Sequence, residues 1–186
     1  MPISVIVPSY NPPHAHLAVL YASLLAQTMA DFECILVDDG SSDDSAYALI
    51  TDPRFRVVRR AKNAGPAACR NAGTAEARHD MLFFTDTDCE LHPDCLAHVA
   101  ALLARDEIGV GDTVTKTKTI FGKAVALLGF PGGGAIGFHN VWRVDDAGYT
   151  RSFSTCNLAF RKATFEALGR FNETFPVAGG EDTVLA

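Results

Sequence analysis

The feature that most constrains the fold is an alternation, along the first hundred residues, of short apolar runs and longer amphipathic stretches. The apolar runs are rich in β-branched and aromatic residues, as buried strands are, and they occupy residues 3–7, 32–37, 55–59 and 81–85. After the first run, apolar residues recur with the spacing of one buried helical face, at Leu17, Leu20, Tyr21, Leu24 and Leu25. This alternation predicts an α/β fold: a Rossmann-like, mostly parallel central sheet with helices on both faces.

Local signals indicate where some of these elements end. Pro8 is expected to end the first strand, because proline has no N–H to donate to a sheet ladder. Ser41 or Ser42 is expected to cap a helix that runs through residues 47–50. Pro93 suits the first turn of the last helix before the pattern changes.

Beyond Arg105 the alternation gives way to a mixed pattern. Residues 135–161 resemble strands with long connections, and a short helix is expected to end at Gly169. No repeat and no linker composition divides the chain, so we expect a single domain over residues 1–186, with halves at 1–105 and 106–186.

Composition and charge describe a globular protein without a basic surface. The 22 acidic and 16 basic residues give a net charge of −6, which argues against a nucleic-acid partner. The five cysteines are odd in number and include no C-x-x-C, so we expect reduced thiols in a cytoplasmic protein. We find no signal-peptide pattern. Residues 120–130 fit either a buried helix or one that rests on the inner face of a membrane, so peripheral membrane contact stays open.

Polar side chains follow the predicted strands, where parallel strands bring their carboxyl ends to one edge of a sheet. Tyr10 could stack on a base, and Asp38 or Asp39 could accept a hydrogen bond from a base or a ribose. Arg70, within the helix that precedes the fourth strand, could reach a phosphate. A helix-capping turn with solvated acids would explain the D-D-G-S stretch equally well.

Two further acidic pairs are candidate site residues. Asp86 and Asp88 stand one residue apart at the end of the fourth apolar run, where both carboxylates can converge on a hard divalent cation. Glu181 and Asp182 follow two glycines at a predicted helix start, which favours either a general base or a simple cap. The sequence contains neither G-x-G-x-x-G after its first strand nor a P-loop.

Together these stretches resemble family 2 glycosyltransferases, the inverting enzymes with the GT-A fold. Six motifs carry the resemblance in the family's order, across essentially the whole chain: ISVIVPSYN, ILVDDGSSD, NAGPAACRNAG, LFFTDTD, TCNLAFRK and GGED. Such an ordered set is far more specific than any one of its members. In TCNLAFRK, Asn157 and Arg161 either line the same cleft or merely complete a strand.

The resemblance implies a role for each matching residue. Pro8 and Tyr10 would border the nucleotide base, Asp39 would bind the base with Asp38 alongside, and Arg70 would lie near the nucleotide. Asp86 and Asp88 would bind Mn²⁺ or Mg²⁺ on the diphosphate, with Asp86 also contacting the nucleotide sugar. Asp182 would be the catalytic base, with Glu181 beside it. All these positions are read from the matching motifs.

The implied reaction moves a sugar from a nucleotide-sugar donor, with a UDP-sugar as the first candidate, to a saccharide or lipid-linked acceptor. Residues 1–105 would bind the donor and 106–186 the acceptor, although family members commonly continue past the E-D pair, so we expect a truncated or short second half. Two alternatives stay open. FFTDTDCEL also resembles the D-x-D-G-T of haloacid-dehalogenase-type phosphatases, with Cys89 in place of the glycine, and the chain could be a non-catalytic nucleotide-sugar-binding domain.

Overall fold

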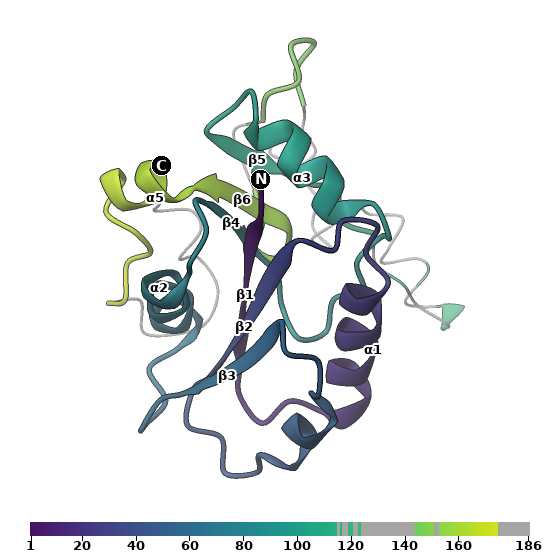
Figure 1. Ribbon diagram of the computed structural model, residues 1–186, viewed down its shortest axis with the longest axis vertical. Coiled ribbons are helices and arrows are strands. Elements are labelled where there is room, and N and C mark those ends of the chain that lie inside the picture. The colour runs from purple at the N-terminus through teal and green to yellow at the C-terminus, as the bar shows by residue number, and fades with distance from the viewer. Residues whose placement is uncertain (115, 117–118, 121–122, 124–143, 151–152, 175–186) are drawn as a thin grey trace.

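A six-stranded sheet forms the centre of the molecule in the computed structural model, which describes residues 1–114, 116, 119–120, 123, 144–150 and 153–174. The strand order is β3-β2-β1-β4-β6-β5 (Figure 1). Strands β1 (Ile3–Ser9), β2 (Phe32–Asp38), β3 (Phe55–Arg59) and β4 (Met81–Phe84) are parallel, whereas β6 (Leu158–Arg161) is antiparallel to β4 and to β5 (Ile108–Val110). The predicted α/β fold with a mostly parallel sheet is confirmed.

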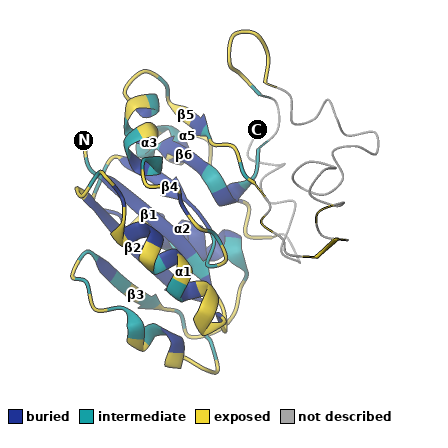
Figure 2. Cartoon of the chain, turned by 90° about the vertical axis from the view of Figure 1, so that its right-hand side faces the viewer, coloured by how far each residue is buried: buried dark blue, intermediate teal, exposed yellow. Residues whose placement is uncertain are grey.

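Helices cover both faces of the sheet. Helices α1 (His14–Leu25) and α3 (Cys95–Leu103) pack on one face, and α2 (Pro66–Glu76) and α5 (Lys162–Ala167) pack on the other (Figure 1). Alternate residues of β1 enter the two cores, with Val5 and Val7 under α1 and Ile6 under α2. The central strands are therefore buried on both sides (Figure 2), which is why they appear in the sequence as unbroken apolar runs.

The first strand does not end at Pro8 as predicted. It pairs with β2 through Ser9, which lies opposite Asp38. The ladder with β4 ends earlier, at Ile6 and Phe84. The carbonyl oxygen of Ile6 accepts from Thr85 N, the residue just after β4. Backbone groups two residues apart in a strand point to the same side, so Pro8 faces the side where the ladder with β4 has already ended. Its missing N–H therefore costs no sheet hydrogen bond.

The helix predicted through residues 47–50 is not an α-helix, so this prediction is also wrong. The chain forms only a 3-10 helix, η1 (Ser45–Leu49), preceded by Asp44, and Ser41 and Ser42 do not cap it. Both serines instead contact Asn11, as described below. Pro93 lies two residues before α3, outside its first turn.

Small residues bring α2 close to the sheet. Its buried positions include Ala67, Ala68, Cys69 and Gly73. A Cβ atom on Gly73 would lie 2.5 Å from the Cγ2 atom of Ile6, so only glycine permits this approach. The close packing fixes the residues of α2 that point toward the carboxyl edge of the sheet.

The second half of the chain joins the same sheet through β5 and β6. The helix ended by Gly169 is confirmed as α5, and Gly169 has a φ of +90°. Residues 135–143 and 151–152, most of 120–130, and Glu181 and Asp182 lie outside the described residues. In the stretches that are described, no helix has both the length and the apolar character needed to cross a bilayer.

Candidate functional site at the carboxyl edge of the sheet

The carboxyl ends of the parallel strands form one continuous edge. Beyond the strands, Asp39 N donates to Ser9 O at 2.8 Å, Arg60 N to Asp38 O at 2.8 Å, and Thr85 N to Ile6 O at 3.2 Å. These bonds extend the ladder one step past each strand end. The polar residues that follow β1, β2, β3 and β4 therefore begin from neighbouring points (Figure 1).

Asp38 is fully buried, and its carboxylate is engaged within the protein. Arg59 Nε donates to Oδ2 at 2.8 Å and Ser41 N donates to Oδ1 at 3.0 Å. Burial by itself would raise the pKa of Asp38, but the hydrogen bonds from Ser41 and Arg59 outweigh it and hold the pKa below its ordinary value. The charged carboxylate therefore stabilises the turn after β2.

Asp39 is almost as buried and accepts N–H groups with both oxygens. Gly65 N donates to Oδ2 at 2.7 Å, Ala64 N lies 3.1 Å from each oxygen, and Arg60 donates to Oδ1 at 3.2 Å. Gly65, with a φ of +89°, is the residue before α2. Asp39 thus holds the turn that leads into α2 against the end of β2.

Asn11 links the loops after β1 and β2, and sequence reasoning assigned it no role. Its Oδ1 accepts from Ser42 N at 2.9 Å and Asp43 N at 3.2 Å, and its own N–H donates to Ser41 Oγ at 2.7 Å. Asn11 has a φ of +43°, a conformation in which asparagine is enriched, and that preference was the available signal. These bonds fix the loop that presents Tyr10, a residue that is 54% exposed.

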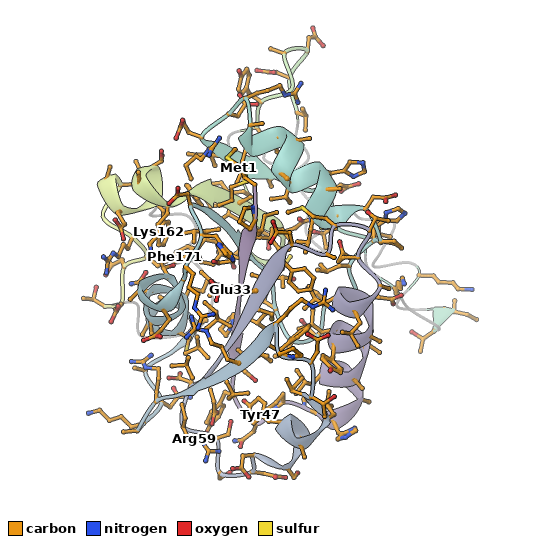
Figure 3. The ribbon with its side chains drawn as sticks, in the orientation of Figure 1. Met1, Glu33, Tyr47, Arg59, Lys162 and Phe171 are labelled. Atoms are coloured by element: carbon orange, nitrogen blue, oxygen red, sulfur yellow. The ribbon has the colours of Figure 1, made fainter. Side chains whose placement is uncertain are left out.

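Tyr47 contacts the end of β1, just before the same loop. Its hydroxyl donates to Ser9 Oγ at 2.8 Å, and burial raises its pKa, so the hydroxyl keeps its proton as a donor. Tyr47 and Arg59 lie at the lower end of the molecule in Figure 3, opposite Met1. Beside them, a hollow of about 360 Å³ is lined by Gly40, Ser41, Arg59, Arg60 and Ala61.

Arg70 is a buried cation that reaches the D-x-D stretch. Its side chain is 3% exposed, and its Nη2 donates to Asp86 Oδ1 at 2.8 Å. The small residues of α2 bring Arg70 to this position, since the helix approaches the sheet closely at Gly73. The structure therefore joins two predicted site residues, Arg70 and Asp86, in one ion pair.

The residues predicted to bind a metal ion lie just past β4. Asp86 has a 33% exposed side chain beside Arg70, and Asp88 is exposed. Among the described residues no three His, Cys, Asp or Glu side chains form a metal cage. Two carboxylates at an open edge suit a hard cation whose other ligands come from a bound diphosphate and water.

The two residues predicted in TCNLAFRK lie at opposite ends of β6. Leu158 lies opposite Phe84, and Arg161 lies opposite Met81, because the strand is antiparallel. Asn157 is therefore at the edge that carries Asp86, where its Nδ2 donates to Asp112 O at 2.9 Å. Arg161 is at the opposite edge, where it contacts Met1, so the two residues do not share a cleft.

Comparison with solved structures identifies the fold. The chain superposes on a mannosyltransferase from Pyrobaculum calidifontis, solved in complex with GDP-Man and Mn²⁺, with a TM-score of 0.73 and 24% identity over 97% of this chain and 49% of that one. It superposes on residues 1–349 of TarS from S. aureus, in complex with UDP, with a TM-score of 0.70 and 20% identity over 100% of this chain and 54% of that one. The sheet and its polar edge define a GT-A domain.

Within that class the family is clear. The model described as "Glycosyl transferase family 2" matches residues 4–168, and the chain belongs to this family of transferases. The match to the O-antigen biosynthesis protein RfbC of Myxococcus xanthus is 28% identical and covers 96% of this chain. An uncharacterized glycosyltransferase of Haemophilus influenzae is 37% identical over 50% of this chain.

The chain is short relative to these proteins. It covers 15% of RfbC and 32% of the Haemophilus protein. It spans about half of each solved structure, 49% and 54%. The resemblance to family 2 and to the GT-A fold is confirmed, and the residue assignments within the site stay predictions.

Proposed function

We propose that this domain transfers a sugar from a nucleotide-sugar donor to an acceptor hydroxyl, using a divalent metal ion and inverting the anomeric carbon. The observation that carries the proposal is that β1, β2 and β4 of this family 2 domain end at one edge of the sheet. Tyr10, Asp39 and Asp86 come just after these three strands. In open α/β sheets ligands bind outside the carboxyl ends of the strands.

The donor's base and diphosphate would meet different parts of this edge. The exposed ring of Tyr10 offers a stacking surface for the base, and Pro8 lies two residues before it in β1. Asp39, with Asp38 alongside, would form the acidic side of the base site. Arg70 supplies positive charge near the diphosphate. A UDP-sugar is the first candidate because TarS binds UDP and UDP-GlcNAc, and a GDP-sugar is the second because the Pyrobaculum neighbour binds GDP-Man.

Asp88 and Asp86 fit a shared Mn²⁺ or Mg²⁺ site. Asp88 is exposed at the strand end, and Arg70 fixes the orientation of Asp86 beside it. Carboxylate oxygens are the ligands that such hard cations prefer. When bound there, the cation would offset the negative charge that develops on the leaving diphosphate.

The acceptor hydroxyl must lose a proton as its oxygen attacks the anomeric carbon. Asp182, with Glu181 beside it, is the candidate general base in the G-G-E-D motif. Attack on the face opposite the departing nucleoside diphosphate inverts the anomeric centre without a covalent enzyme intermediate. Arg70 and Asp86 would meanwhile hold the donor's leaving group in line.

The proposal is tested by titrating UDP and GDP against the protein by calorimetry, with and without Mn²⁺. We expect Mn²⁺ to tighten binding of one nucleotide by about tenfold or more, which corresponds to about 1.4 kcal/mol. Asp88→Ala should abolish this metal dependence. Asp31→Ala is the matched control, because Asp31 is an exposed aspartate just before β2, at the opposite edge of the sheet.

Binding of either nucleotide that is equal with and without metal, and unchanged in Asp88→Ala, would contradict the metal site. Transfer itself is tested by release of the nucleoside diphosphate from the donor sugar, which should depend on Asp182. Donor binding without any release would favour the non-catalytic alternative. Membership of family 2 supports the transferase over the phosphatase alternative.

A further inference from the structure

A segment from the end of the described chain returns to α2 and is held there by one side chain. After α5, Gly169 and Arg170 both have positive φ values, +90° and +66°, and the chain reverses toward α2. Asn71 then bonds both main-chain groups of Phe171: Nδ2 donates to the carbonyl oxygen at 2.8 Å, and Oδ1 accepts from the N–H at 3.1 Å. The same Nδ2 donates to Glu173 Oε1 at 2.8 Å.

This docking places the ring of Phe171 against the buried guanidinium of Arg70. The Cζ atom of Arg70 lies 5.6 Å from the ring centroid, and Phe171 is 2% exposed. The ring also packs on Phe84, the last residue of β4, with centroids 5.3 Å apart. Figure 3 shows Phe171 beside α2, between that helix and α5. Phe171 therefore contacts the donor-site arginine and the strand that leads into Asp86.

An aromatic face next to a guanidinium has two physical effects. The ring quadrupole attracts the cation, and the attraction is stronger when the pair is removed from water. The ring also excludes water from one side of Arg70, which strengthens the ion pair that Arg70 makes with Asp86. Both effects favour the single orientation of Arg70 in which Nη2 meets Asp86.

We propose that Phe171 is a positioning residue of the nucleotide-sugar site: its ring holds Arg70 against Asp86, and Asn71 holds the ring in place through the main chain. The inference rests on the proposed function, and it adds a residue from the second half of the chain to a donor site otherwise built by the first half. Because Asn71 bonds the main chain of Phe171 and not its ring, changing the Phe171 ring leaves these docking bonds intact.

The test compares two phenylalanines of one aromatic cluster. Phe165 is fully buried and packs on Phe84 and on Phe171 itself, with centroids 5.2 Å from each. The cation contacts found in the described residues pair Arg70 with Phe171 and not with Phe165. Phe171→Leu and Phe165→Leu both remove a buried ring, so both are expected to lower stability. Only Phe171→Leu removes the ring that faces Arg70.

We expect Phe171→Leu to weaken UDP or GDP binding in the presence of Mn²⁺ by about 3- to 20-fold, and Phe165→Leu to change it by less than about twofold. Phe171→Tyr, which keeps the ring, should restore most of the affinity. Calorimetry gives the dissociation constants, and thermal unfolding verifies that each variant is folded. If Phe171→Leu does not fold, Phe171→Met serves instead, because it keeps side-chain volume without an aromatic face.

Equal losses in Phe171→Leu and Phe165→Leu, or no recovery in Phe171→Tyr, would overturn the inference and leave Phe171 as ordinary core. Failure of the proposed function has a different result: the wild-type protein itself would bind neither UDP nor GDP. The two failures are therefore separated by the wild-type titration.

Discussion

The acidic residues at the carboxyl edge differ from one another in their surroundings. Asp38 and Asp39 are buried and accept hydrogen bonds from the protein, Asp86 is half-buried beside Arg70, and Asp88 is exposed. Neighbouring carboxylates in one motif can therefore act differently. The two buried residues hold the turns that border the proposed base site, and the more exposed pair lies where the metal ion is proposed to bind.

Asp39→Asn is expected to lower the free energy of unfolding by about 1–3 kcal/mol, the cost of leaving a buried donor unsatisfied. Both oxygens of Asp39 accept N–H groups, so an amide turned either way would direct its own NH₂ at Ala64 or Gly65. Urea unfolding at neutral pH measures the difference. Asp31→Asn, at an exposed site, should stay within about 0.5 kcal/mol of the wild type. Equal stability of the two variants would show that Asp39 does not hold this turn.

At the scale of elements, α2 positions more of the site than the other helices that the structure describes. It begins at the turn held by Asp39, presents Arg70 to Asp86, and binds the returning segment through Asn71. It can do so because its buried face is made of small residues, which let its axis approach β1 and β2. The polar contacts of the site therefore depend on an apolar contact beneath them.

Gly73→Ala tests this dependence. Alanine would improve helix propensity by at most about 1 kcal/mol, whereas overpacking a fixed core costs about 1–3 kcal/mol, so we expect a net loss of stability. The new Cβ would meet Ile6 Cγ2 at 2.5 Å and Val37 Cγ2 at 3.1 Å, and both side chains are fully buried. Thermal unfolding measures the loss of stability, and nucleotide titration measures whether a shifted α2 weakens binding.

Ala75→Gln, on the exposed side of the same helix, is the control for Gly73→Ala. It should change stability by no more than about 0.5 kcal/mol. A Gly73→Ala protein that is as stable as the wild type and binds nucleotide equally well would mean that α2 can shift outward without moving Arg70.

At the scale of the whole molecule, buried carboxylates stabilise both edges of the sheet. Asp38 ends β2 at the carboxyl edge, and Glu33, near its start, accepts from Ser4 Oγ and Arg78 N at 2.7 Å each. Burial alone would raise the pKa of Glu33, but the bonds from Arg78 and Ser4 and the charge of Arg56 lower it below its ordinary value. One strand therefore carries a stabilising charge at each end.

These lowered pKa values predict acid sensitivity of the folded state. A carboxyl group whose pKa is lower when folded stabilises the protein above its unfolded pKa of about 4, and that contribution is lost as the pH falls through the folded value. We expect the free energy of unfolding to be steady near neutral pH and to fall below about pH 4. Urea unfolding at a series of pH values measures it, and Glu33→Gln should show a smaller fall. Stability that rises between pH 5 and pH 3 would contradict this account.

Periodicity in the sequence was sufficient to predict the four parallel strands and the helices α1, α2 and α3. Strand β3 has the predicted bounds, and α1 buries Leu17, Leu20 and Leu24 as expected. Leu25, predicted on the same buried face, is exposed because it lies at the end of the helix. Where the prediction was wrong, long-range contacts decided. Pro8 stays in its strand because the neighbouring ladder has ended, and Ser41 and Ser42 bond to Asn11, thirty or more residues away, in place of a local helix.

The sequence by itself determined the class of fold, the family and the polar residues that follow each strand, because burial on two faces and the sharp turns at strand ends leave local patterns. Only the tertiary structure decided which of those residues are buried in turns and which stay exposed. It alone paired Arg70 with Asp86 and brought Phe171 to Arg70. Those contacts join residues far apart in the chain, and they depend on how closely a helix packs on a sheet, which no local pattern records.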